Sequence, residues 1–267
     1  MFSDVRGFTS ISELYKDDPQ GLTALMNNFL TPMTNAIVEK NGTIDKYIGD
    51  AIMAFWSAPL HDPAHEINAC AAALEMLARV DLLNEQREKE AALTGQRFIP
   101  LKIGVGLNSG RCVVGNMGSN LRFNYSVLGD CVNLASRLEG QTKSYDVPII
   151  IGSRTAQAAR GKFALLELDC ITVKGKTEPE TIYTILGRAD VAQSESFLRM
   201  EALFNEMLAL YRRQDFAGAG EAIVRCRAAG EGFTLNRLFD IYSLRIGGFQ
   251  KDAPPSDWNG VFALDSK

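Results

Sequence analysis

The chain has 267 residues, 46% hydrophobic and 22% charged, a composition that fits a globular protein of one main unit plus a small appendage. Its net charge of -4 argues against a nucleic-acid partner held by a broad basic surface. The five cysteines are scattered without a C-x-x-C pair, which indicates reduced thiols in the cytoplasm rather than a disulfide framework or a zinc site. No apolar stretch approaches the roughly 18 residues that would cross a bilayer.

The first hundred residues alternate between strand and helix patterns. Gly49-Asp50 separates two β-rich runs, which predicts a hairpin with a two-residue turn, and Asn41-Gly42 is a typical helix stop. We expect a strand that ends near Phe2, strands over 43–48, 51–56 and 101–107, and helices over 10–41 and 63–93. The resulting order, βαββαβ, predicts a ferredoxin-like α+β fold.

The rest of the chain predicts additions to this core. We expect appended strands over 112–115, 123–128, 147–151, 164–168 and 181–186, with helices over 130–143 and from 153. From 194 to 248 only helical periods occur, spaced like a single tetratricopeptide-like unit that is too short to be stable alone. We therefore divide the chain into a main domain at 1–188, a helical extension at 189–250 and a tail at 251–267 that is ordered by contacts.

Two aspartates at turns are the first sign of chemistry. Asp4 precedes the turn Val5-Arg6-Gly7-Phe8-Thr9, which leads into a helix whose free backbone N–H groups suit a polyphosphate. Asp50 lies at the hairpin tip, and the third strand of a ferredoxin-like sheet neighbours the first. Two carboxylates that meet there need a hard divalent cation such as Mg²⁺ between them. The alternatives are a helix-capping Asp4 and an Asp50 that only closes a hairpin.

Two later segments carry further polar groups. Asn133 and Arg137 are four residues apart on a predicted helix and so share one face, where an amide and a guanidinium suit a ribose and a phosphoryl group. Lys174 and Lys176 flank Gly175 in a turn that suits terminal phosphates. An exposed polar helix face and a solvated lysine turn are the alternatives.

Taken in this order, the four segments resemble the catalytic domain of class III adenylate and guanylate cyclases, over roughly residues 1–186. The resemblance implies a nucleotidyl cyclase that binds ATP, with two Mg²⁺ or Mn²⁺ ions per site. The roles it implies are metal binding by Asp4 and Asp50, substrate binding by Phe8, Thr9 and either Lys174 or Lys176, ribose orientation by Asn133, and stabilisation of the α-phosphate by Arg137.

The same resemblance assigns the choice of purine to two positions. Lys46 matches the residue that is lysine in adenylate cyclases and glutamate in guanylate cyclases, since an ammonium donates to adenine N1 but cannot accept from guanine. Ser126 matches a position with aspartate in many adenylate cyclases and threonine or serine in a subset that resembles bicarbonate-responsive enzymes. A hydroxyl can accept from the adenine 6-amino group, but it can also donate to guanine O6.

The family resemblance also implies a homodimer with two shared active sites, gripped by a hairpin arm over 110–124. The segment Trp258-Asn259-Gly260-Val261-Phe262 is similar to the tail of bacterial cyclases with a sensor and membrane helices upstream, which would make this chain the cytoplasmic part of such a protein. Two alternatives to an adenylate cyclase remain open. One is a guanylate cyclase, and the other is an inactive nucleotide-binding regulatory module.

Overall fold

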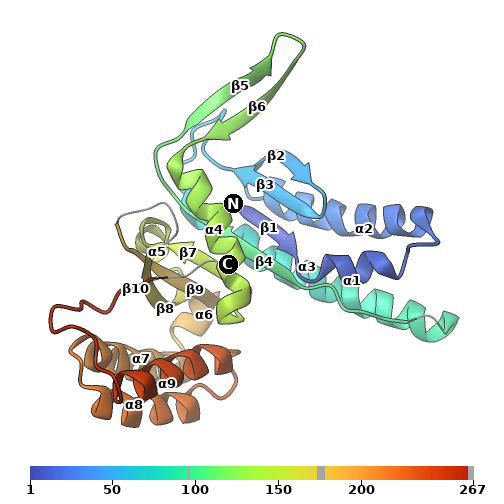
Figure 1. The fold of residues 1–267 in the computed structure, drawn as a ribbon. Coiled ribbons are helices and arrows are strands. Elements are labelled where there is room, and N and C mark those ends of the chain that lie inside the picture. Colours follow the sequence, from blue (N-terminus) through green and yellow to red (C-terminus); the bar gives the residue numbers. More distant parts are fainter. Residues whose placement is uncertain (96, 173–177, 264–267) are drawn as a thin grey trace. The chain divides into compact units, whose positions relative to one another are not determined.

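The computed structural model describes residues 1–95, 97–172 and 178–263, and the chain forms two compact units, residues 1–140 and 141–267 (Figure 1). Across the described residues, every helix is too short or too polar to cross a bilayer.

The strands of the first unit form the expected ferredoxin-like arrangement. Strand β1 (Phe2–Val5) pairs antiparallel with both β3 (Ala51–Phe55) and β4 (Ile103–Leu107), and β2 (Thr43–Ile48) pairs with β3. The connecting helices are α2 (Pro19–Val38) and α3 (His65–Thr94), preceded by a short α1 (Phe8–Glu13). The βαββαβ order is therefore confirmed. One detail differs, because Asp4 lies inside β1 and pairs with Gly104 rather than following the end of the strand.

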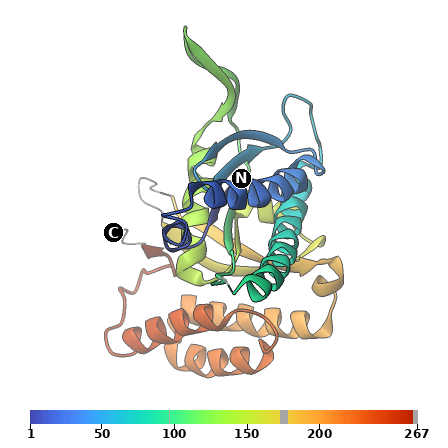
Figure 2. The ribbon, with the colours of Figure 1, turned by 90° about the vertical axis from the view of Figure 1, so that its right-hand side faces the viewer.

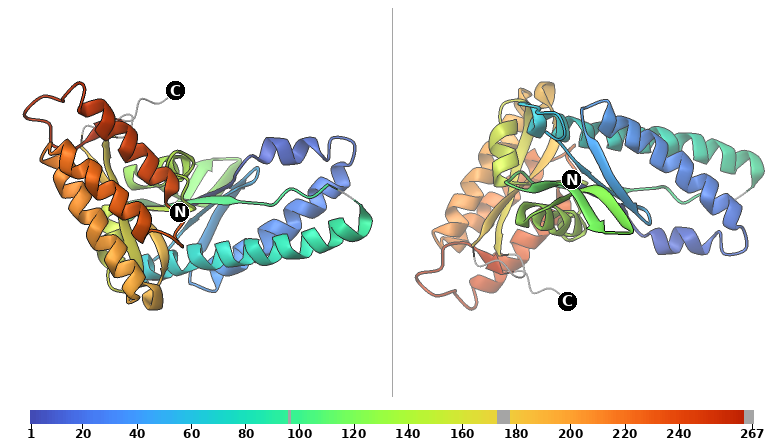
Figure 3. Two further views of the ribbon diagram at one scale, coloured as in Figure 1. Left: turned by 90° about the horizontal axis from the view of Figure 1, so that it is seen from below. Right: turned by 90° about the horizontal axis from the view of Figure 1, so that it is seen from above.

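The core of the first unit lies between its strands and the helices α2 and α3, which run along the same side of the strands (Figure 3). Helix α2 buries an apolar residue at every fourth position, which is the spacing of one helical face. Its buried residues are Leu25, Phe29, Met33, Ala36 and Ile37, and those of the strands include Ile52 and Val105. This packing positions the two strands that carry the predicted aspartates, because Asp4 lies within β1 and Asp50 lies in the turn that precedes β3.

Two further elements complete the first unit. Strands β5 (Val113–Ser119) and β6 (Arg122–Leu128) form a two-stranded hairpin that projects from the other strands (Figure 2). Helix α4 (Asp130–Tyr145) follows and lies directly on β4. A Cβ at Gly106 would come within 2.2 Å of the Ala135 carbonyl oxygen and 2.3 Å of the Glu139 nitrogen. Only glycine at this position lets the helix approach the strand so closely.

The second unit combines a small sheet with the helical extension. Strand β9 (Glu180–Arg188) pairs with β7 (Ile149–Gly152) and β8 (Phe163–Thr172), and the short β10 (Phe262–Ala263) runs parallel to β8. Its helices are α5 (Ser153–Ala159), α6 (Ala189–Ala192), α7 (Glu195–Arg212), α8 (Phe216–Ala229) and α9 (Asn236–Phe249). The expected helical extension is thus confirmed.

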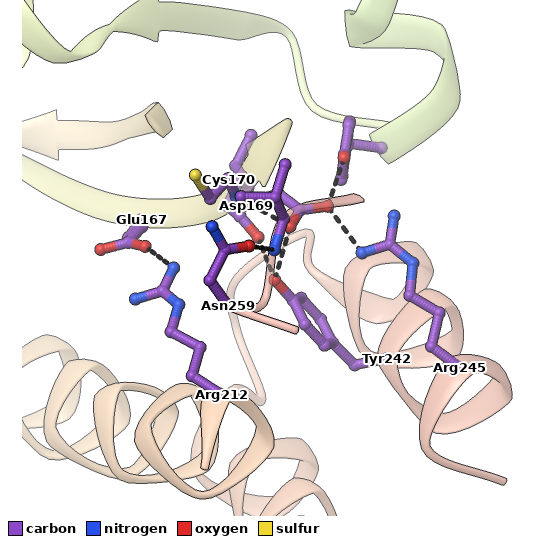
Figure 4. Close-up of polar contacts among 10 residues, drawn as sticks. Glu167, Asp169, Cys170, Arg212, Tyr242, Arg245 and Asn259 are labelled. Carbon is purple, nitrogen blue, oxygen red and sulfur yellow. Dashed lines mark hydrogen bonds and ion pairs between the residues drawn. The ribbon is translucent and has the colours of Figure 1, made fainter. Parts of the chain in front are cut away.

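A buried polar cluster joins the extension to β8 (Figure 4). Asp169 accepts hydrogen bonds from the Tyr145 hydroxyl at 2.7 Å and the Tyr242 hydroxyl at 3.3 Å, and it pairs with Arg245 at 2.6 Å. The Asp169 side chain is 2% exposed and that of Arg245 10%, so the ion pair is shielded from water. Charged groups are tolerated at such depth only when they are paired and hydrogen-bonded, and these are.

Aromatic rings hold the segment around Trp258 in place. Trp258 stacks edge-on against Tyr211 with centroids 5.1 Å apart and against Phe249 at 5.0 Å. Arg245 also lies over the Phe262 ring, 3.5 Å from its centroid. Contacts of this kind add about 0.5–1.5 kcal/mol each beyond the burial of their area, which is enough to order a short segment.

Candidate active site

The structure brings Asp4 and Asp50 together. Ser3 pairs with Ile52 across the β1–β3 ladder, so the carboxylate of Asp4 lies beside the turn that carries Asp50. Burial, the charge of Asp4 and a hydrogen bond between the two carboxyl groups together raise the pKa of Asp50 from 3.8 to about 6, and burial contributes most. The juxtaposition expected from the fold is therefore present, and it carries unfavourable like-charge repulsion.

This carboxylate pair fits a divalent cation. Each side chain offers hard oxygen atoms, and a cation between them would remove the repulsion that raises the Asp50 pKa. No group of three or more His, Cys, Asp or Glu side chains that could hold a metal occurs among the described residues. A cation here would therefore complete its coordination with water or with the oxygens of a substrate, as Mg²⁺ commonly does.

The turn after Asp4 is built as the sequence predicts. Gly7 adopts a left-handed φ of 66°, which glycine tolerates without steric cost, and α1 starts immediately after it. Phe8 and Thr9 are the first two residues of α1. The Ser10 N–H donates a hydrogen bond to the Gly7 carbonyl oxygen, with nitrogen and oxygen 3.0 Å apart. Phe8 and Thr9 thus lie four and five positions along the chain from Asp4, at the start of a helix.

Helix α4 carries Asn133 and Arg137. The Asn133 side chain is exposed, whereas Arg137 is half-buried. The Nη1 atom of Arg137 is buried, and no group in the described part of the chain hydrogen-bonds to it. A buried guanidinium nitrogen without a partner is costly, so it is suited to an anionic ligand. Lys174 and Lys176 lie outside the described residues.

Lys46 and Ser126 are brought together by a residue that the sequence analysis missed. Asp45 accepts a hydrogen bond from the Ser126 hydroxyl at 2.6 Å and another from the Val127 N–H at 3.1 Å, both on Oδ2. Its Oδ1 lies 3.2 Å from Nζ of Lys46, as an ion pair that lacks hydrogen-bond alignment. The Asp45 side chain is fully buried, while that of Lys46 is 42% exposed.

A β-bulge explains why two neighbouring residues of one strand reach the same place. Ile44 pairs with Ala54 and Lys46 with Met53, so Asp45 is an extra residue in β2. Consecutive side chains of a regular strand point to opposite faces, and a bulge relaxes that alternation. The adjacent charged residues Asp45 and Lys46 in a β-rich run were the sign of this site in the sequence. The partner of Asp45, Ser126 on β6, lies 81 positions further along the chain, so the sequence alone does not connect the two.

The β5–β6 hairpin presents apolar side chains to solvent. Leu121 is 98% exposed, Phe123 66% and Leu128 61%. The root of the hairpin, by contrast, packs into the first unit, where Val127 is buried with Met53 and Phe55. An anchored hairpin with an exposed apolar surface is typical of a contact with another molecule.

Comparison with known proteins places these features in a family. Residues 1–187 match the family described as adenylate and guanylate cyclase catalytic domain. An adenylate cyclase of Anabaena cylindrica is 38% identical over 188 residues, which are 69% of this chain and 36% of that protein. The chain spans between 10% and 36% of the length of three such curated relatives.

Solved structures give the same result. The adenylyl cyclase CyaB from P. aeruginosa matches with a TM-score of 0.59 and 35% identity, over 69% of this chain and 90% of that one. The guanylyl cyclase Cya2 matches with a TM-score of 0.60 and 33% identity, over 70% and 90%. These two relatives differ in the purine that their names specify, so the likeness leaves the purine open. With 187 of its residues matched, this chain belongs to the adenylate and guanylate cyclase catalytic domain family.

Proposed function

We propose that this chain is the catalytic part of an adenylate cyclase, which converts ATP into 3′,5′-cyclic AMP and pyrophosphate. The observation that carries the proposal is the convergence of Asp4 and Asp50 at the β1–β3 edge, with the Asp50 pKa raised by burial and by its neighbour. Such a pair has no structural benefit by itself and becomes favourable when it binds cations.

The proposed reaction is an internal phosphoryl transfer. The ribose 3′-oxygen forms a bond to the α-phosphorus, the bond to the bridging oxygen of the β-phosphate breaks, and the 3′-hydroxyl proton is lost. Mg²⁺ or Mn²⁺ ions held by Asp4 and Asp50 would lower the pKa of the 3′-hydroxyl and neutralise the triphosphate. Arg137, with its unpartnered Nη1, would stabilise charge on the α-phosphate, and Asn133 would orient the ribose.

The phosphates of ATP would be held at two further places. In this proposal the backbone at Phe8 and Thr9 binds oxygens beside Asp4, and Lys174 or Lys176 binds the terminal phosphates. Lys46 favours adenine because its ammonium group can only donate, which suits N1 of adenine and opposes the N1–H of guanine. ATP as substrate also makes the cytoplasm the expected compartment.

Two copies of the chain would share each site. In the proposed homodimer, Asp4 and Asp50 come from one protomer, while Lys46, Ser126, Asn133 and Arg137 come from its partner. The exposed apolar side chains of the β5–β6 hairpin support this arrangement, because they provide a surface for the partner.

Mixing two inactive variants tests the shared site directly. Asp50→Asn and Arg137→Ala should each abolish cyclic AMP production, because each damages a different half of the site. In a mixed dimer one site keeps both intact halves, so random pairing of equal amounts should restore about a quarter of the parent rate. Absence of any recovery, with mixed dimers verified by a tag pull-down, would contradict the shared site.

Guanylate cyclase activity is the second candidate, favoured by the similarity to Cya2 and by the hydroxyl at Ser126. Turnover of ATP and GTP by the purified chain, with Mg²⁺ or Mn²⁺, separates the two. Cyclic AMP with little cyclic GMP supports the first proposal, and equal use of GTP refutes the role of Lys46. No product from either nucleotide at any protein concentration would favour an inactive regulatory module.

A further inference from the structure

Asp45 belongs to neither the metal pair nor the residues that would contact the phosphates, yet its carboxylate is buried in the first unit and contacts both candidate purine residues. We infer that Asp45 is a specificity-determining residue, which makes Ser126 a hydrogen-bond acceptor toward the purine and so excludes guanine. This inference rests on the proposed function, because it assigns Lys46 and Ser126 to the purine.

Ser126 has a single hydroxyl proton, and this limits the hydrogen bonds that it can make. A hydroxyl group carries one hydrogen and two lone pairs, so it can donate only once. In this structure Ser126 Oγ donates to Asp45 Oδ2 at 2.6 Å, within the range of strong charge-assisted bonds. With its proton committed to a carboxylate, Ser126 has only lone pairs left for a ligand.

Asp45 is well placed to hold that proton. An ionised carboxylate accepts only, so it cannot return a donor to the serine. The Val127 N–H donates to the same Oδ2 at 3.1 Å, which fixes the carboxylate against the backbone of β6. Because the side chain is excluded from solvent, water does not compete for the bond.

The same carboxylate leaves Lys46 free to donate. Asp45 Oδ1 and Lys46 Nζ are 3.2 Å apart but not aligned as a hydrogen bond, so this ion pair does not consume the N–H groups of the ammonium. The lysine side chain is 42% exposed and therefore accessible to a ligand. Asp45 thus places a donor and an acceptor next to each other.

This donor–acceptor pair matches adenine and opposes guanine. Adenine presents the N1 acceptor and the 6-amino donor, which meet Lys46 and Ser126 respectively. Guanine presents N1–H and O6, so a donor would face a donor and an acceptor would face an acceptor. A free hydroxyl at position 126 could serve either purine as donor or acceptor. Asp45 on β2 therefore restricts Ser126 to the acceptor role that adenine requires.

Kinetic specificity in the full chain tests this inference. Asp45→Asn replaces the carboxylate with an amide that can donate to the serine, which releases the Ser126 proton for guanine O6. We expect the ratio of kcat/KM for GTP to that for ATP to rise about 10-fold, the effect of correcting one mismatched polar contact. An active variant with an unchanged ratio would overturn the inference.

Ser126→Ala and the double variant show whether Asp45 acts through the serine. Ser126→Ala should lower kcat/KM for ATP more than for GTP, and Asp45→Asn should add little in that background. Equal effects of Asp45→Asn with and without the hydroxyl would refute the proposed route. Ser126→Ala leaves the buried carboxylate in place, so it remains informative if Asp45→Asn does not fold.

A binding readout separates this inference from the proposed function. Displacement of a fluorescent nucleotide by ATP and by GTP, measured with Ca²⁺ in place of Mg²⁺, gives the ratio of Kd values without turnover. A parent that makes no cyclic nucleotide but prefers ATP, with the preference reduced in Asp45→Asn, would refute the cyclase activity and retain the role of Asp45. Equal affinity of the parent for both nucleotides would overturn the role of Asp45.

Discussion

Gly106 controls how closely the helix that carries Asn133 and Arg137 approaches β4. A Cβ added at this position would lie 2.2 Å from the Ala135 carbonyl oxygen and 2.3 Å from the Glu139 nitrogen, whereas ordinary contacts begin at 3.4 Å. Both atoms are helix backbone and cannot turn away as a side chain can. Gly106→Ala should therefore displace α4 by about 1 Å, and a displacement of this size can lower kcat about 100-fold.

The same substitution should destabilise the fold by about 1–3 kcal/mol, the usual cost of overpacking. Cyclic AMP formation measured beside denaturant unfolding gives both quantities. Gly140→Ala is the matched control, because it lies on the same helix and its added Cβ would meet no described atom within 4 Å beyond its own stretch of helix. A Gly106→Ala variant with kcat within about twofold of the parent would show that the position of α4 is not critical.

Three further predictions concern ions, burial and association. Mg²⁺ or Mn²⁺ should raise the Tm of the parent but not of Asp50→Asn. Without divalent ions, Asp50→Asn should be more stable than the parent, because the repulsion from Asp4 is gone. Equal metal-induced shifts of Tm in the two proteins would contradict metal binding by Asp50. Arg245→Ala should lower the free energy of unfolding by about 3–5 kcal/mol, measured with denaturant, because it leaves Asp169 charged and buried. Arg225→Ala breaks the exposed pair with Glu206 and should change the stability little. Similar losses in the two variants would refute the difference between the buried and the exposed pair. Phe123→Arg on the β5–β6 hairpin should weaken the proposed dimer at least about 10-fold in sedimentation, whereas Leu93→Arg, on α3 and even more exposed, should not. An unchanged dimer would exclude the hairpin as its interface.

Periodicity and turn residues predicted the core of the fold. Gly49-Asp50 between two β-rich runs fixed the hairpin, and the known order of strands in a ferredoxin-like sheet then brought Asp50 to Asp4, as the structure confirms. These inferences succeeded because each depends on local sequence or on a common topology.

The features that the sequence analysis did not predict depend on contacts between distant residues. The bond from Ser126 to Asp45 requires both the bulge in β2 and the packing of β6 beside it, and neither has a short-range signal. The sequence places Gly106 within a strand, but it does not show why the residue must be glycine. The cause is the close approach of a helix backbone about 30 residues later in the chain. The strands β5 and β8 are also longer than expected, because pairing extends them beyond their apolar residues.

The cluster around Asp169 bears on how this protein can be divided. A fragment that ended where the cyclase match ends, at residue 187, would lose Arg245 and Tyr242 while keeping Asp169 and Tyr145. The carboxylate would lose its counter-ion, and the apolar faces of β8 and β9 would lose their cover. The three C-terminal helices are thus a structural requirement of this particular sequence rather than an interchangeable module. Exchanging them with those of a relative would require the aspartate and the arginine to be transferred together.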